Sequence, residues 1–282
     1  RAVIGEGTNT LSLYTADVAM SYQTPQHSPS SNNPDVREKG ADIFRICFID
    51  PFQGEVMAKF AHSQFKAKTA AILRDVKQDY SVGLANFFTK AFEAKGGKIV
   101  IDTSYQKDDV DFKAQLTEIK NKKPDVIFIP GYYNEVGLIA RQARSMGLTQ
   151  PLLGGDGWES PDLFKIAGDA IVGSFYSTHY APDTKDAAAQ KFISTYKAEY
   201  KGEVPDAMAA LGYDAFFIIM DALKRGKSIS RDALRDALAQ TRDYMGVTGK
   251  TTINAERNAV KSAVVLKYDS KGDPRYFSTV NP

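Results

Sequence analysis

Three apolar runs of the sequence each end in a loop that carries a tyrosine or a carboxylate. The runs cover residues 70–75, 126–129 and 152–153, and the side chains that follow them are Tyr80, Tyr132 and Asp156. Short apolar runs of this kind are typical of strands buried on both faces of a parallel sheet. Open parallel sheets bind their ligands beside the carboxyl ends of the strands. We therefore expect these three side chains to face one cleft.

Two loops near the start of the chain are rich in hydroxyl and amide side chains. Thr8, Asn9 and Thr10 come between a predicted strand at 2–5 and a predicted helix at 11–22. They could cap that helix, which the spacing favours, or hold an anion with their side chains and amides. The second loop, Ser28–Pro34, suits a turn, and its polar side chains could also line a pocket. Both alternatives stay open from the residues alone.

Together these side chains suit a small zwitterion as ligand. Hydroxyls and amides can hold its carboxylate, Asp156 its ammonium, and the tyrosine rings its side chain. Trp158, the single tryptophan, follows Asp156 by two residues and is predicted to report binding through its fluorescence. A simpler alternative for Asp156 is the capping of a helix that begins near Ser160.

The composition argues against several other classes of protein. The 36 Lys and Arg residues nearly balance 34 Asp and Glu, so nothing suggests a nucleic-acid or membrane surface. No apolar run approaches the roughly 18 residues of a membrane span. A lone cysteine, Cys47, excludes an internal disulfide and a cysteine-based zinc site. We expect no metal, because none of the three histidines has a carboxylate or cysteine nearby at metal-ligand spacing. We expect no cofactor, because phosphate loops and dinucleotide fingerprints are absent, and the absence of a nucleophile elbow argues against a hydrolase.

An enzyme that uses Asp156 as a base and a tyrosine as an acid is a further alternative. Nothing near these residues in the sequence would tune their pKa values for that chemistry. We therefore rank this hypothesis below a binding protein.

The remainder of the chain predicts the elements that would position these loops. Strands of a few residues alternate with amphipathic helices from residue 42 to residue 178. Such alternation predicts a parallel, doubly wound α/β sheet with right-handed connections. Three helices are then predicted at 185–200, 207–224 and 231–241, followed by a hairpin over 261–278.

Several stretches, in order over nearly the whole chain, resemble the branched-chain amino-acid-binding proteins. These are solute-binding proteins of ABC importers with the type I periplasmic binding fold. The stretches are Ser28–Asp35, Asp50–Gly54, Gln78–Gly83, Gly131–Glu135, Arg141–Arg144, Gly154–Trp158 and Ala209–Asp214.

The resemblance implies two doubly wound parallel α/β lobes, joined by a three-strand hinge, with an amino acid held between them. It implies a first lobe of residues 1–50 and 178–254 and a second of residues 51–177 and 255–282. The implied ligand-binding residues of the first lobe are Thr8, Asn9, Thr10, Ser30, Ser31 and Asn32. Those of the second lobe are Tyr80, Tyr132, Asp156 and Trp158, with Asp156 pairing the ammonium.

Two departures from the family pattern bear on the ligand and on the fold. Asn9 and Asn32 stand where this family usually has serine and threonine, which leaves the identity of the amino acid open. The family also begins with a β-α-β-α segment that these residues do not match, so about 60 to 70 residues would be missing. If so, the first lobe should show an unpaired strand edge near residues 2–5.

By this resemblance the protein is a monomer that closes on an amino acid and delivers it to the membrane permease of an ABC importer. It would act in the periplasm or outside the cell, free or lipid-tethered. The alternative is a ligand-sensing domain of a receptor or regulator on the same fold, which would need a fused membrane, kinase or DNA-binding segment.

Overall fold

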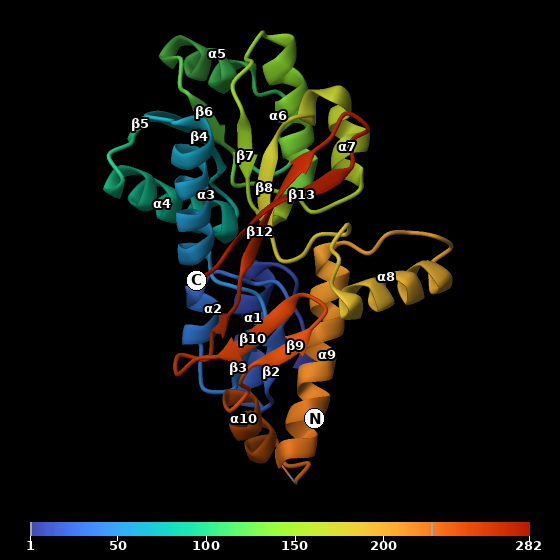
Figure 1. Cartoon of the computed structure of the whole chain (residues 1–282). Helices are drawn as coiled ribbons and strands as arrows, with labels where there is room; N and C mark the ends of the chain where they lie inside the picture. Colours follow the sequence, from blue (N-terminus) through green and yellow to red (C-terminus); the bar gives the residue numbers. More distant parts are fainter. Residues whose placement is uncertain (1, 227) are drawn as a thin grey trace. The chain divides into compact units, whose positions relative to one another are not determined.

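The computed structural model describes residues 2–226 and 228–282 and divides into two compact units (Figure 1). Unit 1 consists of Arg1–Ile49, Pro182–Ala263 and Asn281–Pro282, and unit 2 of Asp50–Ala181 and Val264–Val280. The expected boundaries at 50 and 177 lie within a few residues of this division, whereas the last one falls at Ala263 instead of 254. Arg1, which was counted in the first lobe, lies outside the described residues.

Unit 2 is built on a seven-stranded sheet in the order β13-β12-β8-β7-β6-β4-β5. The strands are β4 (Thr69–Asp75), β5 (Lys98–Tyr105), β6 (Val126–Phe128), β7 (Leu152–Gly154), β8 (Phe175–Thr178), β12 (Ala263–Tyr268) and β13 (Pro274–Val280). The five strands from β4 to β8 run parallel, and β12 is antiparallel to β8. The predicted doubly wound parallel sheet is therefore present, with β12 and β13 added at one edge.

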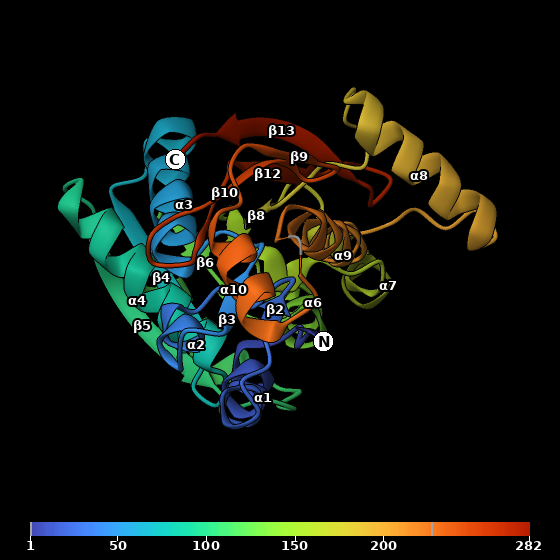
Figure 2. The ribbon, with the colours of Figure 1, turned by 90° about the horizontal axis from the view of Figure 1, so that it is seen from below.

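Helices cover both faces of this sheet. Helices α3 (Asp50–Phe65) and α4 (Asp79–Ala94) pack against each other on one face, apart from α6 (Tyr133–Ser145) and α7 (Asp162–Ala167) (Figure 2). Helix α5 (Lys113–Lys122) shares a core with α6 and α7. The connection through α4 places β5 on one side of β4. The later connections place β6, β7 and β8 on the other side of β4. The strand order consequently reverses between β4 and β6, where ligands of such sheets bind.

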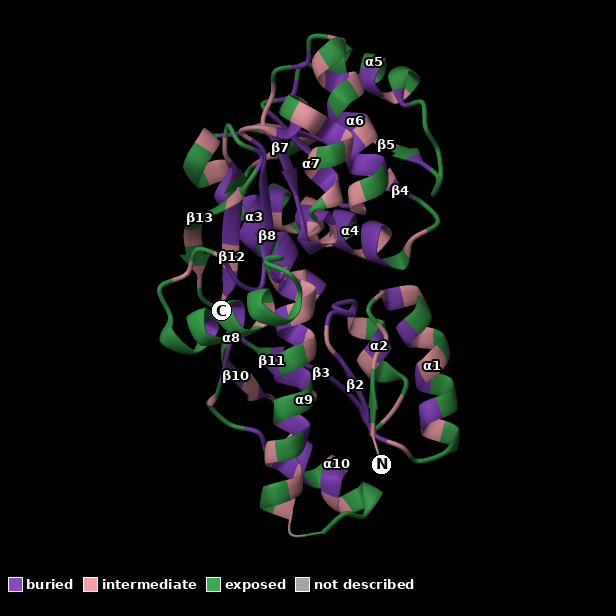
Figure 3. Cartoon of the chain, turned by 90° about the vertical axis from the view of Figure 1, so that its right-hand side faces the viewer, coloured by how far each residue is buried: buried purple, intermediate pink, exposed green. Residues whose placement is uncertain are grey.

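The central strands are buried on both faces, as their continuous apolar runs predict. Ile127 and Ile129 belong to the core shared with α5, α6 and α7. Phe128 points to the opposite face, where its ring stacks on Phe88 of α4 with centroids 4.0 Å apart. Figure 3 shows β7 and β8 as buried throughout their length. This packing fixes where each strand ends and its loop begins.

Unit 1 combines a small parallel sheet, an antiparallel sheet and several helices. The parallel sheet is β1 (Val3–Ile4), β2 (Gln26–Ser28) and β3 (Ile43–Arg45), and the antiparallel one is β9 (Tyr244–Gly246), β10 (Gly249–Ile253) and β11 (Ala259–Val260). The helices are α1 (Asn9–Ser21), α2 (Pro34–Glu38), α8 (Ala187–Glu199), α9 (Ala207–Gly226) and α10 (Arg231–Ala239). Leu211, Ala215 and Ile218 recur at helical spacing on α9 and pack on Phe44 and Ile46.

Strand β1 forms one edge of the parallel sheet in the described part of unit 1, because it pairs with β2 alone. Val3 and Ile4 are 43% and 42% exposed there. The idea that a preceding β-α-β-α segment covers this edge stays a prediction.

The sequence analysis missed α2 and the antiparallel sheet β9-β10-β11. The loop predicted as a turn continues into α2, whose first amides are capped when the Asn33 side chain accepts a bond from Asp35 N–H. The strands of the antiparallel sheet have two to five residues each, too few for a periodic pattern to be recognised.

Candidate functional site

Unit 2 brings Tyr80, Tyr132 and Asp156 together at the carboxyl ends of three neighbouring strands. They follow β4, β6 and β7, and these strands are adjacent in the order β7-β6-β4. The two tyrosine rings lie 5.2 Å apart between centroids. The Tyr80 hydroxyl accepts a hydrogen bond from Gly157 N–H over 3.1 Å, which links it to the turn that carries Asp156. The cluster therefore lies at the reversal of strand order.

The turn after β7 requires a glycine at position 157, because the Tyr80 ring and the Gly131 carbonyl lie so close to it. A Cβ atom at Gly157 would lie 2.6 Å from the carbonyl oxygen of Gly131 and 2.7 Å from the Tyr80 ring. Both distances are shorter than any ordinary van der Waals contact. A side chain at this position would push Tyr80 away from Asp156.

Both tyrosines remain neutral at physiological pH. Burial raises the pKa of the Tyr80 hydroxyl well above its usual value, and the Asp156 charge adds to the shift. Burial likewise raises the pKa of Tyr132, with the charges of Asp156 and Asp50 adding to it. The pair therefore carries neutral hydroxyls beside the Asp156 carboxylate.

The carboxylate of Asp156 is held by two side chains that the sequence analysis did not single out. Its Oδ1 accepts from Gln53 Nε2 and its Oδ2 from His179 Nε2, each over 3.0 Å. The helix near Ser160 is α7, whose N-cap residue is Pro161, and Ser160 Oγ accepts from Asp162 N–H at its start. Asp156 is therefore not the N-cap residue of this helix.

Trp158 does not lie with the presented side chains. Its side chain is fully buried in the core of unit 2, and its indole N–H donates to the Ile129 carbonyl over 2.9 Å. The expectation of direct ligand contact is corrected for this residue. Sequence proximity to Asp156 was misleading because consecutive residues of a turn point to different sides.

In unit 1, Asn9 and Asn32 bind each other and tie two loops together. Asn9 Nδ2 donates to Asn32 Oδ1 over 3.1 Å, and Asn9 Oδ1 accepts from Asn33 N–H over 3.0 Å. Both side chains are buried. The Asn9 amide carries two N–H donors, so one N–H beyond the bond to Asn32 can still serve a ligand.

The serines of the same loop form hydrogen bonds with the segment around the start of α1. The Ser30 hydroxyl donates to the Gly7 carbonyl over 2.7 Å, and the Ser31 hydroxyl lies 2.7 Å from that of Ser12. These bonds bring the loop 28–34 against the start of α1. The polar residues predicted in the first lobe therefore form one cluster within unit 1.

Thr8 occupies the N-cap position of α1, but its side chain makes no capping hydrogen bond. The capping role that the spacing favoured is therefore wrong for this side chain. The alternative, in which the N-terminus of α1 binds an anion through its amides together with Thr8, Asn9 and Thr10, remains as a prediction.

Arg45 is the unexpected member of this cluster. Its side chain is fully buried and donates to the backbone carbonyls of Ser31, Asn33 and Pro34 over 3.0, 2.7 and 3.2 Å. A charged residue within the apolar run 43–48 was the signal in the sequence that could have identified it. The guanidinium fixes the backbone that presents Asn32.

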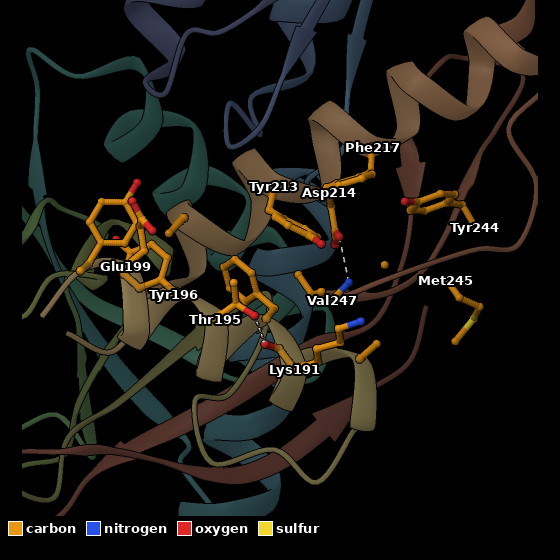
Figure 4. A pocket seen from close by; sticks show the side chains of 15 residues that line it. Lys191, Thr195, Tyr196, Glu199, Tyr213, Asp214, Phe217, Tyr244, Met245 and Val247 are labelled. Carbon is orange, nitrogen blue, oxygen red and sulfur yellow. Dashed lines mark hydrogen bonds between the residues drawn. The ribbon is translucent and has the colours of Figure 1, made fainter. Parts of the chain in front are cut away.

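Unit 1 also contains a groove of about 560 Å³ between α8, α9 and β9 (Figure 4). Aromatic rings line it, and pairs of them are in contact, with centroids 4.3 Å apart for Tyr196–Tyr200 and 4.9 Å for Phe192–Tyr213. Asp214 lies in its wall but accepts bonds from Val247 and Thr248 N–H, both over 2.8 Å. The Phe192–Tyr213 contact joins α8 to α9. None of the predicted ligand-binding residues lines the groove.

Within residues 2–226 and 228–282, no helix combines the length and the apolar character needed to cross a membrane. The same residues contain no group of three or more His, Cys, Asp or Glu side chains arranged to hold a metal ion.

The chain contributes separate segments to each of two α/β units, with the reversal of strand order in unit 2. This is the architecture of the type I periplasmic binding proteins. A model of the periplasmic binding protein family matches residues 1–273. The chain belongs to this family.

Two curated proteins are similar to this chain in sequence. A Leu/Ile/Val-binding protein of Rhizobium johnstonii is 30% identical over 258 residues, which cover 89% of this chain and 68% of that protein. A leucine-, isoleucine-, valine-, threonine- and alanine-binding protein of Pseudomonas aeruginosa is 29% identical over 252 residues, 89% of this chain and 62% of that protein. The chain thus spans about two thirds of the length of these two relatives.

Two solved structures are similar over the whole chain. The leucine-binding protein LivK of Thermotoga maritima is 40% identical with a TM-score of 0.95, covering 100% of this chain and 80% of that one. LivJ of Streptococcus pneumoniae, solved in complex with isoleucine, is 31% identical with a TM-score of 0.92, covering 100% and 79%.

Proposed function

We propose that this protein is the solute-binding component of an ABC importer and captures a branched-chain amino acid. The observation that carries the proposal is the cluster of the buried Asp156 and Tyr80 with the partly buried Tyr132 at the reversal of strand order in unit 2. A carboxylate beside two aromatic rings suits the ammonium and the apolar side chain of an amino acid. The names of the relatives, with leucine or isoleucine as ligands, support the branched-chain class.

The carboxylate of the ligand is assigned to the polar cluster of unit 1. The N-terminus of α1, with Thr8, Asn9 and Thr10, offers amides and hydroxyls to an anion. Ser30, Ser31 and Asn32 would complete this half. Each of the two clusters would suit one end of a zwitterion, the carboxylate for unit 1 and the ammonium for unit 2. Because such a ligand would be delivered to a membrane permease, we also propose that the protein is extracytoplasmic. We further propose that it acts as a monomer and without a cofactor.

A thermal-shift screen against the twenty amino acids tests the proposal. Leucine, isoleucine or valine should raise the melting temperature, since saturation to 100 times Kd stabilises a protein by about 2.7 kcal/mol. The ligand should be recovered intact by mass spectrometry, as expected of binding without chemistry. No shift with any amino acid, or conversion of the ligand, would refute the proposed function.

A further inference from the structure

The side chains of Gln53 and His179 hold Asp156 in a buried three-residue network in unit 2. Gln53 comes from α3, Asp156 from the turn after β7, and His179 directly follows β8. Their exposed fractions are 0%, 4% and 2%. Each donor serves a different oxygen of the carboxylate over 3.0 Å. A buried carboxylate with two separate donors is fixed in position and in the orientation of its plane.

The amide of Gln53 is itself oriented by the sheet. Its Nε2 also lies 3.3 Å from the Ser177 carbonyl in β8. The carboxylate and the carbonyl are both acceptors, so the NH2 end of the amide must face them, and its two N–H groups serve one acceptor each. Gly155 leaves the room for this, because a Cβ atom there would lie 3.0 Å from Gln53 Nε2.

His179 determines how much negative charge the network retains. Nε2 must carry a proton in order to donate to Asp156, which holds for the neutral Nε2–H tautomer and for the imidazolium. With the neutral tautomer the pair keeps one negative charge. With the imidazolium its net charge is zero, and the attraction for an incoming ammonium is lost.

We propose that Gln53 and His179 are positioning residues for Asp156, and that Asp156 accepts the ammonium of the ligand while His179 is the neutral Nε2–H tautomer. The inference rests on the proposed function and deepens it. Capture of an amino acid then expels the proton from His179 in acidic solution. By thermodynamic linkage, ligand affinity falls as the pH falls below the pKa of His179 in the free protein, by up to about ten-fold per pH unit.

The other titratable groups near the network are tyrosines and carboxylates. Tyr80 and Tyr132 stay neutral because burial raises their pKa values. The charges of Asp156 and of Asp50 at the start of α3 act on both tyrosines, and those of Asp75 and Asp79 act on Tyr132 as well. Carboxylates ordinarily titrate near pH 4, below the window in which a histidine titrates. Burial raises the pKa of Asp75 above that range, so the His179→Gln variant, which keeps Asp75, separates its contribution from that of His179.

Calorimetric titration of the whole protein with L-leucine between pH 5.5 and 8 tests the inference. The His179→Gln variant cannot titrate, so whatever its affinity at pH 8, that affinity should no longer fall as the pH is lowered to 5.5. Gln53→Met should weaken leucine binding by about ten- to a hundred-fold, since it removes one bond to a charged group. The matched controls are His62→Gln and Gln142→Leu, which remove a histidine and a backbone-bonded glutamine elsewhere in unit 2.

Proton release in wild type gives a readout that needs no variant. Titrations at pH 6 in buffers of different ionisation enthalpy should show net release of a fraction of one proton per leucine. If wild type binds leucine with no proton release, or if His179→Gln keeps the wild-type pH profile, the role of His179 is overturned. If Gln53→Met binds as tightly as wild type, the role of Gln53 is overturned. A wild type that binds no amino acid would instead refute the proposed function.

Discussion

The charge of Asp156 is predicted to supply the largest polar share of the ligand affinity. Truncating one partner of a desolvated charge pair costs about 2–5 kcal/mol. In this protein both carboxylate oxygens already accept hydrogen bonds, so a ligand ammonium would share them with Gln53 and His179. We therefore expect the lower part of that range for Asp156→Asn, about 2–3.5 kcal/mol, which is about a 30- to 300-fold loss of leucine affinity.

Comparison of Asn and Ala at this position separates charge from structure. Asp156→Asn keeps one oxygen acceptor at this position. Asp156→Ala leaves the buried donors of Gln53 and His179 without an acceptor, and each such loss costs about 1–3 kcal/mol of stability. The alanine variant should therefore melt at a lower temperature than the asparagine variant. The control is Asp162→Asn, which removes a half-exposed carboxylate whose partner is Lys165 and should change neither property.

The assay is calorimetric titration with leucine, valine, alanine and phenylalanine, alongside thermal unfolding. Trp158 fluorescence should follow the unfolding of unit 2 more than ligand binding, because the indole is fully buried and bonded to Ile129. An Asp156→Asn variant that melts normally and binds leucine as tightly as wild type would refute the assignment of the ammonium to this carboxylate.

Three further predictions concern buried basic side chains in unit 1. Arg45→Met should lower the free energy of unfolding, measured in urea, by about 3 kcal/mol and should weaken leucine binding, because three loop carbonyls lose their donor. The control Arg235→Met, on the surface, should change neither property. Burial lowers the pKa of Lys261 from 10.5 to about 8, so between these pH values the unfolded chain binds more protons than the folded one. The free energy of unfolding should therefore rise from pH 8 to pH 10, and a Lys261→Met variant with the same rise would contradict this. Burial lowers the pKa of His27 from 6.5 to about 4, so the stability that its neutral form contributes should be lost as the pH falls from 6.5 to 4, and thermal melts of His27→Gln should lack that component.

Local sequence determined the strand ends on which the candidate site is built. The apolar run 126–129 had to be buried on both faces, and Pro130-Gly131 had to end it, because these properties follow from side-chain chemistry and backbone geometry alone. Tyr132 was therefore placed correctly at the end of β6, and the same reasoning placed Tyr80 and Asp156 at the ends of neighbouring strands.

Only the tertiary structure decided which partners those side chains have. Asp156 is bound by residues 103 and 23 positions away, and no local pattern encodes such pairings because they depend on strand order and helix placement. The same reason explains the errors at Thr8 and Trp158. The type of a residue and its neighbours predict what it can bind, whereas the direction of its side chain is set by packing against segments distant in the sequence.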